Sequence, residues 1–262
     1  MIKKLTAMML GTALVILCLV GCGGSRSGNS AISDAAQNAK WIIATDTVFQ
    51  PFEYTNEKNQ FVGIDVDLLA AIAEDQGFTY ELRSLGWDAA VTAVEAGQAD
   101  AIIAGATINQ DRIDNGWIFS DDYYDATQTF VVKKDSKIKK WKDLAGKKVA
   151  VKKGTTGADF ANSLKDRYDF TVTVFEDSVA MYRDVIHSNA AACVEDTPII
   201  SFSIKKDNLD LRIPKGMESE GAPYGMAIMD ESNRKLLDMF NSGLAHIKKS
   251  GEYRKILDKY LK

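Results

Sequence analysis

Cysteine and histidine, the residues that most often build metal sites, are scarce in this sequence. Its 262 residues include only three cysteines and two histidines. His187 and His246 each stand alone, and no Cys/His cluster has the spacing of metal ligands. Cys193 lies in the small apolar run 190–194, which is typical of a buried core residue, with a reactive thiol as the alternative. We therefore expect no metal site.

A strong positive charge and phosphate-binding motifs are also missing. The chain has 32 lysines and arginines against 36 acidic residues, a net charge of −4, and such a mildly acidic chain is a poor nucleic-acid binder. The loop Lys-Gly-Thr-Thr-Gly at 153–157 could be mistaken for a phosphate cradle. It does not fit Gly-x-x-x-x-Gly-Lys-Ser/Thr, and no dinucleotide fingerprint occurs elsewhere. We therefore expect no nucleic-acid partner and no cofactor.

The first 40 residues have the pattern of an export signal followed by a linker. Two lysines precede an apolar stretch at 5–20, which is shorter than the roughly 20 residues of a spanning helix. The Leu-Val-Gly-Cys at 19–22, where this stretch ends, resembles the lipobox of bacterial lipoproteins, which implies cleavage before Cys22 and lipidation of that cysteine. An uncleaved anchor and a plain secretory signal are the alternatives. We predict a signal peptide at 1–21 and a flexible tether at 22–40 that reaches about 20–25 Å.

From Trp41 onward, short apolar runs typical of strands alternate with helical patterns, which favours an α/β fold. We expect a helix from Asp65, as its N-cap, to Gln76, with Gly77 as the C-terminal stop. The pattern of strand, helix, strand, helix, strand occurs twice, which predicts two lobes. The first unit has strands at 42–44, 78–82 and 101–104 with helices at 65–76 and 89–96. The second has strands at 148–151, 172–175 and 190–194 with helices after 156 and at 179–188.

The end of the chain helps to place the boundary between the lobes. A strand at 224–228, a long helix at 233–249 and a last helix ending at 261 follow the second unit. The simplest architecture returns this segment to the first lobe, so that two crossings near 127–131 and 222–226 form a hinge. The predicted division is lobe 1 at 41–127, lobe 2 at 128–222, and a return to lobe 1 at 223–262.

Five groups of residues fall at the ends of predicted strands, where open α/β sheets place their ligands: 46–49, 87, 104–112, 152–157 and 195–196. The same region of the chain contains the motifs TDTVFQPF at 45–52, GIDVDL at 63–68, GATINQDR at 105–112, VAVKKGTTG at 149–157 and DTP at 196–198. In this order they resemble polar amino-acid-binding proteins of bacterial ABC importers, the family 3 extracellular solute-binding proteins, and most of all the glutamine-binding ones. The resemblance covers nearly the whole body. It implies a two-lobed, periplasmic-binding-protein-like (type II) α/β fold with a two-crossing hinge.

The resemblance implies that Arg112 and Asp196 bind the two charged groups of an amino acid. Arg112 would pair bidentately with the carboxylate, and Asp196 would accept the α-ammonium. The alternative for Arg112 is a surface ion pair with Asp111 or Asp114. For Asp196 the alternative is capping of the helix that starts at 197–198, a role compatible with ligand contact.

Other contacts are implied by the same resemblance. Phe49 and Trp87 would sandwich the aliphatic stem of the ligand, although aromatic residues are also common in plain cores. The remaining expected contacts are Ala104, Gly105 and Thr107 in the first lobe, and Lys152 and Thr156 in the second.

Three charged residues bear on which amino acid is bound. A carboxylate at Asp46 would accept hydrogen bonds from an amide or a cation and would repel an acidic side chain. Lys152 would oppose a cationic tip, whereas Glu195, the spare acid of the cleft, would favour one. We expect glutamine, with arginine or lysine as the alternative. The lysine-rich segment 133–148 is expected to be a solvated face, or else a permease-docking surface.

Together these patterns predict a monomeric, extracytoplasmic binding protein that is held at the outer face of the membrane by its lipid alone. It would deliver a free amino acid to an ABC permease, and it would not be an enzyme. A cleft dehydratase and a ligand sensor are the alternatives from other classes. The sequence disfavours the dehydratase because no nucleophile and base occur at usable spacing.

Overall fold

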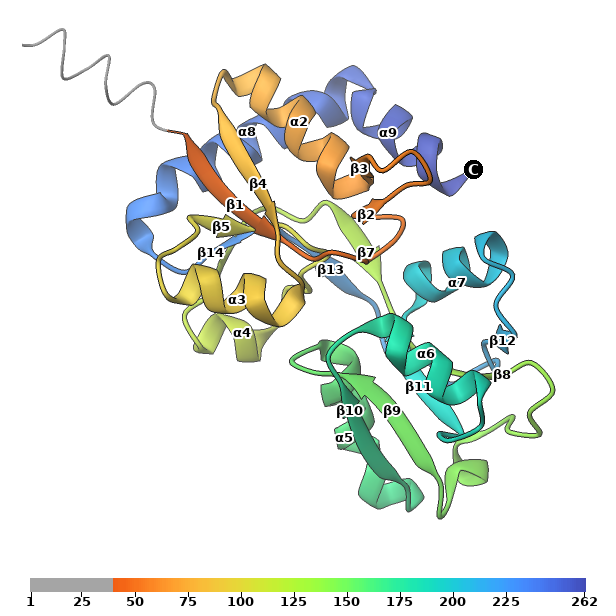
Figure 1. Ribbon diagram of the computed structural model, residues 1–262. Helices are drawn as coiled ribbons and strands as arrows, with labels where there is room; N and C mark the ends of the chain where they lie inside the picture. Colours follow the sequence, from red (N-terminus) through yellow and green to blue (C-terminus); the bar gives the residue numbers. More distant parts are fainter. Residues whose placement is uncertain (1–39) are drawn as a thin grey trace, which may run out of the picture. The chain divides into compact units, whose positions relative to one another are not determined.

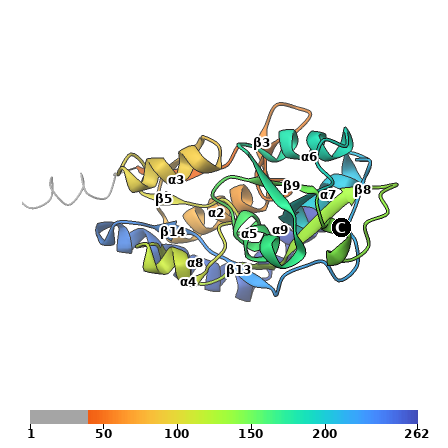
Figure 2. The same ribbon diagram turned by 90° about the horizontal axis from the view of Figure 1, so that it is seen from below.

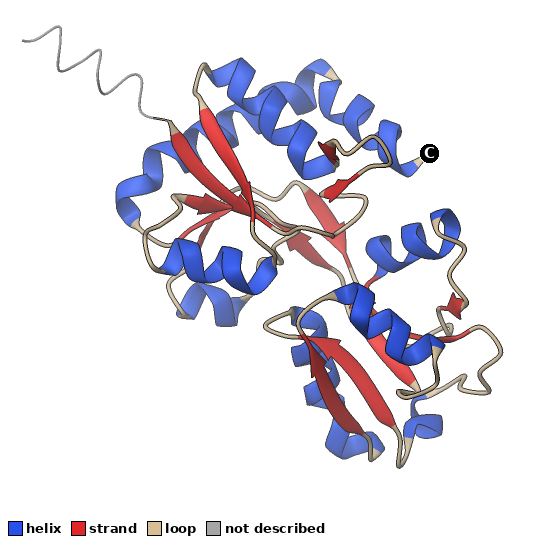
Figure 3. Ribbon diagram, in the orientation of Figure 1, coloured by secondary structure: helices blue, strands red, loops and turns tan. Residues whose placement is uncertain are grey.

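The computed structural model describes residues 40–262, which form one compact unit. The predicted signal peptide, the tether up to residue 39, and Cys22 lie outside the described residues. Among residues 40–262, no helix is both long and apolar enough to cross a membrane. Strands and helices alternate along the chain and build two five-stranded sheets (Figure 3).

The first sheet has the strand order β4-β1-β5-β14-β6. Its strands are β4 (Tyr80–Ser84), β1 (Trp41–Thr45), β5 (Ala101–Ile102), β14 (Ala227–Ile228) and β6 (Ile118–Phe119). β1 runs parallel to β4 and β5, whereas β14 is antiparallel to both β5 and β6. Because β14 comes from the last part of the chain, that segment contributes a strand to this sheet.

Helices cover both faces of the first sheet (Figure 1). α2 (Ile64–Gln76), α8 (Arg234–Ser250) and α9 (Glu252–Leu261) share an apolar cluster with Ile43 of β1. α3 (Trp87–Glu95) packs with Ala44, the next residue of the same strand. Since successive side chains of a strand point to opposite faces, α3 and α8 lie on opposite sides of β5 and β14, as Figure 2 shows. The short helix α4 (Gln110–Asp114) follows β5.

The second sheet has the order β10-β9-β11-β8-β12. Its strands are β10 (Thr171–Phe175), β9 (Lys148–Lys152), β11 (Ala192–Asp196), β8 (Gln128–Lys133) and β12 (Leu211–Arg212). On one face Val149 and Val151 pack against α5 (Thr156–Tyr168), and on the other Ala150 and Cys193 pack against α6 (Ser178–Ile186). α7 (Thr197–Lys206) follows β11. Cys193 is fully buried, as expected for a core residue.

Two short antiparallel strand pairs complete the described chain. β7 (Tyr124–Ala126) pairs with β13 (Ala222–Tyr224), where the chain leaves the first sheet and returns to it. β2 (Tyr54–Thr55) pairs with β3 (Phe61–Val62) beside the start of α2. Short 3-10 helices occupy Trp141–Leu144 and Glu231–Asn233. The expected division at 127/128 and 222/223 stays a proposal.

Two local predictions were wrong. Asp65 is not the N-cap of α2: the cap is Gly63, and Asp65 is buried within the first turn. Gly63 has a φ of 147°, and a Cβ added there would lie 1.9 Å from the Phe52 carbonyl oxygen, so the tight entry to the helix requires glycine. The single strand expected at 224–228 is broken between β13 and β14. The Gly225 N–H there donates to the Ala106 carbonyl oxygen (3.0 Å).

Candidate functional site

A small cavity brings together every residue predicted to contact a ligand. Its volume is about 20 Å³, near the space that one water molecule needs. The residues follow the carboxyl ends of β1, β4 and β5 in the first sheet and of β9 and β11 in the second, or lie at the end of one of these strands. The lining residues are Asp46, Phe49, Trp87, Ala104, Gly105, Thr107, Arg112, Lys152, Thr155, Thr156, Glu195 and Asp196. Their roles as ligand contacts stay predictions.

Aromatic rings, and not carboxylates, surround the guanidinium of Arg112. Its Cζ lies 4.9 Å from the ring centroid of Trp87 and 5.0 Å from that of Trp117. Nη1 donates to the Thr107 carbonyl oxygen (2.7 Å). Burial lowers the pKa of Arg112 to about 10, and the charges of Asp196 and Asp159 oppose that shift. The guanidinium therefore keeps donors available for an anion.

The alternative role of Arg112, a surface ion pair with Asp111 or Asp114, is wrong. Among residues 40–262 neither carboxylate forms a salt bridge with it, and Asp114 instead accepts a hydrogen bond from Gln110 Nε2 (2.8 Å). The start of α4 explains why: the Asn109 side chain accepts from the Arg112 N–H (2.8 Å). This cap fixes the backbone at the start of α4, from which the arginine side chain packs against both tryptophan rings.

Asp196 ends β11 and directs its carboxylate to the cavity. Tyr224 OH donates to Oδ2, and Gln128 Nε2 donates to Oδ1 (3.2 Å). Burial, together with the charge of Glu195, raises the pKa of Asp196 to about 7, although the two hydrogen bonds and Arg112 act in the opposite sense. Asp196 is the N-cap residue of α7, but its side chain makes no capping hydrogen bond. The carboxylate is therefore available to a cation in the cavity.

Asp46 and Lys152 form a buried ion pair between the two sheets. Lys152 Nζ donates to Asp46 Oδ2, and the two residues are only 5% and 3% exposed. The same ammonium lies 5.7 Å from the ring centroid of Phe49. The sequence suggested two independent charges at this end of the cavity, but the structure pairs them. Each charge therefore largely cancels the field of the other.

Glu195 is not the spare acid that the sequence suggested. Its Oε2 accepts hydrogen bonds from Ser178 Oγ (2.7 Å) and Tyr182 OH (2.7 Å), and its Oε1 accepts from the Asp196 N–H (3.0 Å). Both hydroxyls belong to α6, which packs on β11 and covers the carboxylate. A buried carboxylate needs such donors, so Glu195 is held by its own lobe.

The remaining predicted residues join the two sheets or shape the cavity wall. Trp87 Nε1 donates to the Gly154 carbonyl oxygen (3.0 Å), and the hydroxyls of Thr107 and Thr156 lie 3.2 Å apart. Gly105 has a φ of 55°, and a Cβ added there would lie 2.4 Å from Phe49 Cε1. Only glycine lets the Phe49 ring pack this closely on the loop after β5.

Three residues of the site were missed from the sequence. Thr155 lines the cavity and caps α5, accepting from the Ala158 N–H (3.2 Å). Tyr224 and Gln128 hold the carboxylate of Asp196. Thr155 lay inside a recognised motif, and the other two lay beside the expected crossings. The sequence pattern marks these segments, but it does not tell where their side chains point.

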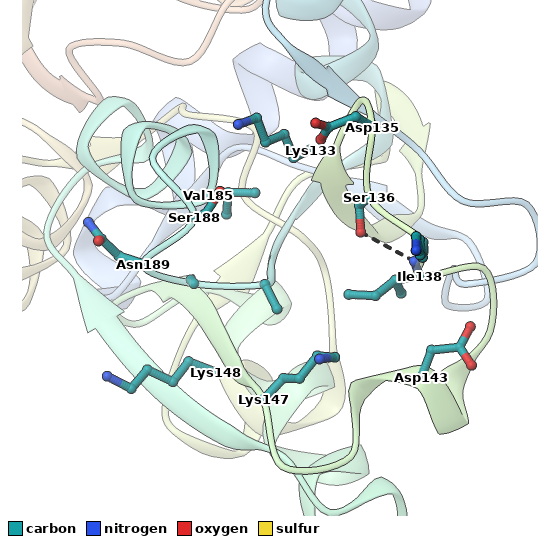
Figure 4. Close-up of a pocket in the computed structure, with 13 residues that line it drawn as sticks. Lys133, Asp135, Ser136, Ile138, Asp143, Lys147, Lys148, Val185, Ser188 and Asn189 are labelled. Carbon is teal, nitrogen blue, oxygen red and sulfur yellow. Dashed lines mark hydrogen bonds between the residues drawn. The ribbon is translucent and has the colours of Figure 1, made fainter.

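A larger hollow of about 600 Å³ lies at the opposite end of the second sheet. Lys133, Lys147 and Lys148 line it together with Asp135 (Figure 4), and none of the predicted ligand contacts does. The hydrogen bond drawn there joins the Ile138 N–H to Ser136 Oγ (3.2 Å). Most of its lysines are exposed, which agrees with a solvated face.

Residues 41–262 match the model of the bacterial extracellular solute-binding proteins, family 3. The chain belongs to this family. The arginine-binding extracellular protein ArtP of Bacillus subtilis (strain 168) is 32% identical over 261 residues, which cover 97% of this chain and 96% of ArtP. The predicted two-lobed α/β fold is confirmed, because solved relatives of this solute-binding protein share it.

Two solved structures illustrate the range of the family. An ancestral arginine-binding protein bound to glutamine is 31% identical, with a TM-score of 0.76 over 85% of this chain and 97% of its own. Substrate binding domain 2 of GlnP from Lactococcus lactis, in an open conformation, is 39% identical, with a TM-score of 0.58 over 84% of this chain and 94% of its own. Family membership alone therefore does not single out the ligand of this solute-binding protein.

Proposed function

We propose that this solute-binding protein captures free glutamine outside the cell and delivers it to an ABC permease. The observation that carries the proposal is the guanidinium of Arg112, which packs against two neighbouring tryptophan rings and has no carboxylate partner among residues 40–262. A carboxylate would accept two parallel hydrogen bonds from it. Asp196, whose charge acts on Arg112, would accept the α-ammonium. The two side chains thus complement a zwitterion.

Capture would couple ligand binding to contact between the lobes. Arg112 belongs to the segment of the first sheet, and Asp196 ends a strand of the second. A ligand that pairs with both stabilises the state in which they are close, through its differential contacts. The charges of the ligand are then buried beside partners, which offsets a desolvation cost that would otherwise be large.

The Asp46–Lys152 pair supports glutamine over arginine and glutamate. At about 4 Å, the attraction of a cationic tip to Asp46 and its repulsion from Lys152 are each about 4 kcal/mol at an effective dielectric constant of 20, and they nearly cancel. The pair would therefore do little to offset the desolvation of a buried guanidinium or carboxylate. A neutral amide can accept from Lys152 and donate to Asp46 at a much lower desolvation cost.

Binding without catalysis fits the chemistry of the cavity. Glu195, the acid that a dehydratase would need, already accepts three hydrogen bonds. The relatives described above are named as binding proteins. We further propose that lipidation of Cys22 holds the protein, as a monomer, at the outer face of the membrane.

A thermal-shift screen of the purified protein against all the free amino acids tests this proposal. A ligand at 100 times its dissociation constant adds roughly 2.7 kcal/mol to the free energy of unfolding, so glutamine should give the largest shift. A largest shift with arginine or lysine, and none with glutamine, would replace the proposed ligand. No shift with any amino acid would contradict the proposed function itself.

A further inference from the structure

Three carboxylate oxygens near the ligand cavity have no hydrogen-bond donor among residues 40–262. They are Oε1 and Oε2 of Glu53 and Oδ1 of Asp65. Glu53 is 0% exposed and Asp65 is 1% exposed, and the two side chains lie within hydrogen-bonding reach of each other. Two ionised carboxylates in such a place would repel each other without compensation by water. The arrangement needs a proton between them.

The two acids hold two walls of the cavity. Asp65 Oδ2 accepts hydrogen bonds from the Gly105 N–H (2.8 Å) and from Tyr123 OH (2.9 Å). The backbone of Glu53 pairs with that of Phe49. The Phe49 N–H donates to the Glu53 carbonyl oxygen (2.7 Å), and the Glu53 N–H donates to the Phe49 carbonyl oxygen (3.2 Å). Gly105 and Phe49 both line the cavity and pack on each other. A shift of either acid would therefore displace the wall.

The charges around the pair do not balance two carboxylates. Besides Asp65, the groups that act on Glu53 are Asp46, which follows β1, and Lys152 of β9. Tyr123 faces both acids from the segment before β7. Lys152 already forms an ion pair with Asp46, so its positive charge cannot also neutralise an ionised Glu53. Burial and the two nearby carboxylates raise the pKa of Glu53 well above its ordinary value.

We propose that Glu53 is protonated at neutral pH and donates its proton to Asp65 Oδ1, and that this acid pair positions Gly105 and Phe49 at the ligand cavity. The proton gives Oδ1 a donor and removes one of two charges. Asp65 is the ionised member because its Oδ2 already has two donors, whereas the Glu53 carboxyl has none among residues 40–262. The positioning role rests on the proposed function, but the shared proton does not.

Three variants of the full chain separate the parts of this proposal. Glu53→Gln keeps the shape and a donor toward Asp65 but cannot ionise. Glu53→Ala removes both. Glu57→Gln makes the same chemical change on an exposed residue four positions along the chain and serves as the control.

Infrared spectroscopy in D₂O at neutral pH tests the proton directly. The wild-type minus Glu53→Gln difference spectrum should contain the carbonyl stretch of a protonated carboxylic acid. The wild-type minus Glu57→Gln spectrum should lack it. If the first difference spectrum contained the band of an ionised carboxylate and no carboxylic-acid band, the proposal would be overturned. This result does not depend on which ligand the protein binds.

The pH dependence of unfolding gives a second readout. Because the pKa of Glu53 is raised in the folded state, its contribution to stability is complete below the unfolded value and is lost as the pH rises toward the folded value. The unfolding temperatures of the wild type and Glu57→Gln should therefore fall more steeply than that of Glu53→Gln between about pH 5 and pH 8. Parallel curves for all three would contradict the shared proton.

Ligand binding tests the positioning role. Glu53→Gln should bind glutamine within about threefold of the wild type, since its donor to Asp65 is retained, whereas Glu53→Ala should lose about tenfold or more. Equal losses in both variants would mean that the charge of Glu53 is needed, which overturns the proposal. If the wild type itself bound no amino acid, the proposed function would fail, while the infrared and unfolding results would still decide whether the proton is shared.

Discussion

At the scale of single residues, the site contains two cations: Arg112 has no carboxylate partner within residues 40–262, and Lys152 forms an ion pair. The guanidinium of Arg112 contacts two tryptophan rings, and such a contact contributes about 0.5–2 kcal/mol, depending on desolvation. The ammonium of Lys152 is instead matched by Asp46. This difference explains why a carboxylate would be drawn to Arg112, and why the Lys152 end of the cavity suits a neutral group.

Replacement of Lys152 by methionine should change the ligand preference. Lys152→Met leaves the buried carboxylate of Asp46 without its cation, so a cationic tip could take that place. We expect the ratio of the arginine to the glutamine dissociation constant to fall by tenfold or more, which is about 1.4 kcal/mol. Competition binding with the two amino acids measures this ratio.

Lys153→Met is the matched control, because the adjacent lysine is exposed and pairs with Asp88 outside the cavity (2.7 Å). Its preference should stay that of the wild type. An unchanged ratio in Lys152→Met would show that the ion pair does not set the specificity.

At the scale of elements, the first sheet is stabilised by contacts between its earliest and latest helices. Asp67 in the first turn of α2 accepts hydrogen bonds from Lys259 Nζ (2.6 Å) and from Tyr260 OH (2.9 Å) of α9. The hydroxyl of Tyr260 also accepts from the Gly63 N–H (3.2 Å). α9 thereby holds the start of α2 in place, close to the buried pair of Glu53 and Asp65.

Removal of the Tyr260 hydroxyl should weaken this attachment without affecting the ligand. We expect Tyr260→Phe to lower the free energy of unfolding by about 1–2 kcal/mol, because a carboxylate and an N–H each lose a partner. Glutamine affinity should be unchanged, since neither group lines the cavity. Chemical denaturation and calorimetry measure the two quantities.

Tyr168→Phe provides the comparison, because the Tyr168 ring stacks on Trp141 and its hydroxyl makes no hydrogen bond within residues 40–262. Its stability should stay close to that of the wild type. Equal stability of Tyr260→Phe and the wild type would contradict the proposed role of the last helix.

Sequence periodicity predicted the alternation of the longer strands and helices, and the resemblance to the family implied every residue that lines the cavity except Thr155. Buried valines alternate with Ala150 in β9, a local pattern that can be read directly. The side-chain pairings could not be predicted. Asp46 and Lys152 lie 106 residues apart, and nothing local to either indicates that they neutralise each other. The same is true of Glu195, whose two hydroxyl donors come from α6.

At the scale of the whole molecule, the two five-stranded sheets of the described chain both contribute residues to the candidate ligand cavity, and the chain crosses between them twice. β7 and β13 pair where those crossings occur. Tyr224 of β13 donates to Asp196 of the second sheet, so the crossing strand contacts the residue proposed to bind the α-ammonium. We propose that ligand binding and the arrangement of the crossings are coupled through this contact.

The measurement that tests the account most directly is calorimetric titration of glutamine into the wild type and into Arg112→Lys. Lysine keeps the positive charge but lacks the fork that pairs bidentately with a carboxylate. The account predicts one glutamine bound per wild-type chain. For Arg112→Lys it predicts no measurable binding and an unfolding temperature close to that of the wild type without ligand. Binding by Arg112→Lys with the wild-type affinity would contradict the account.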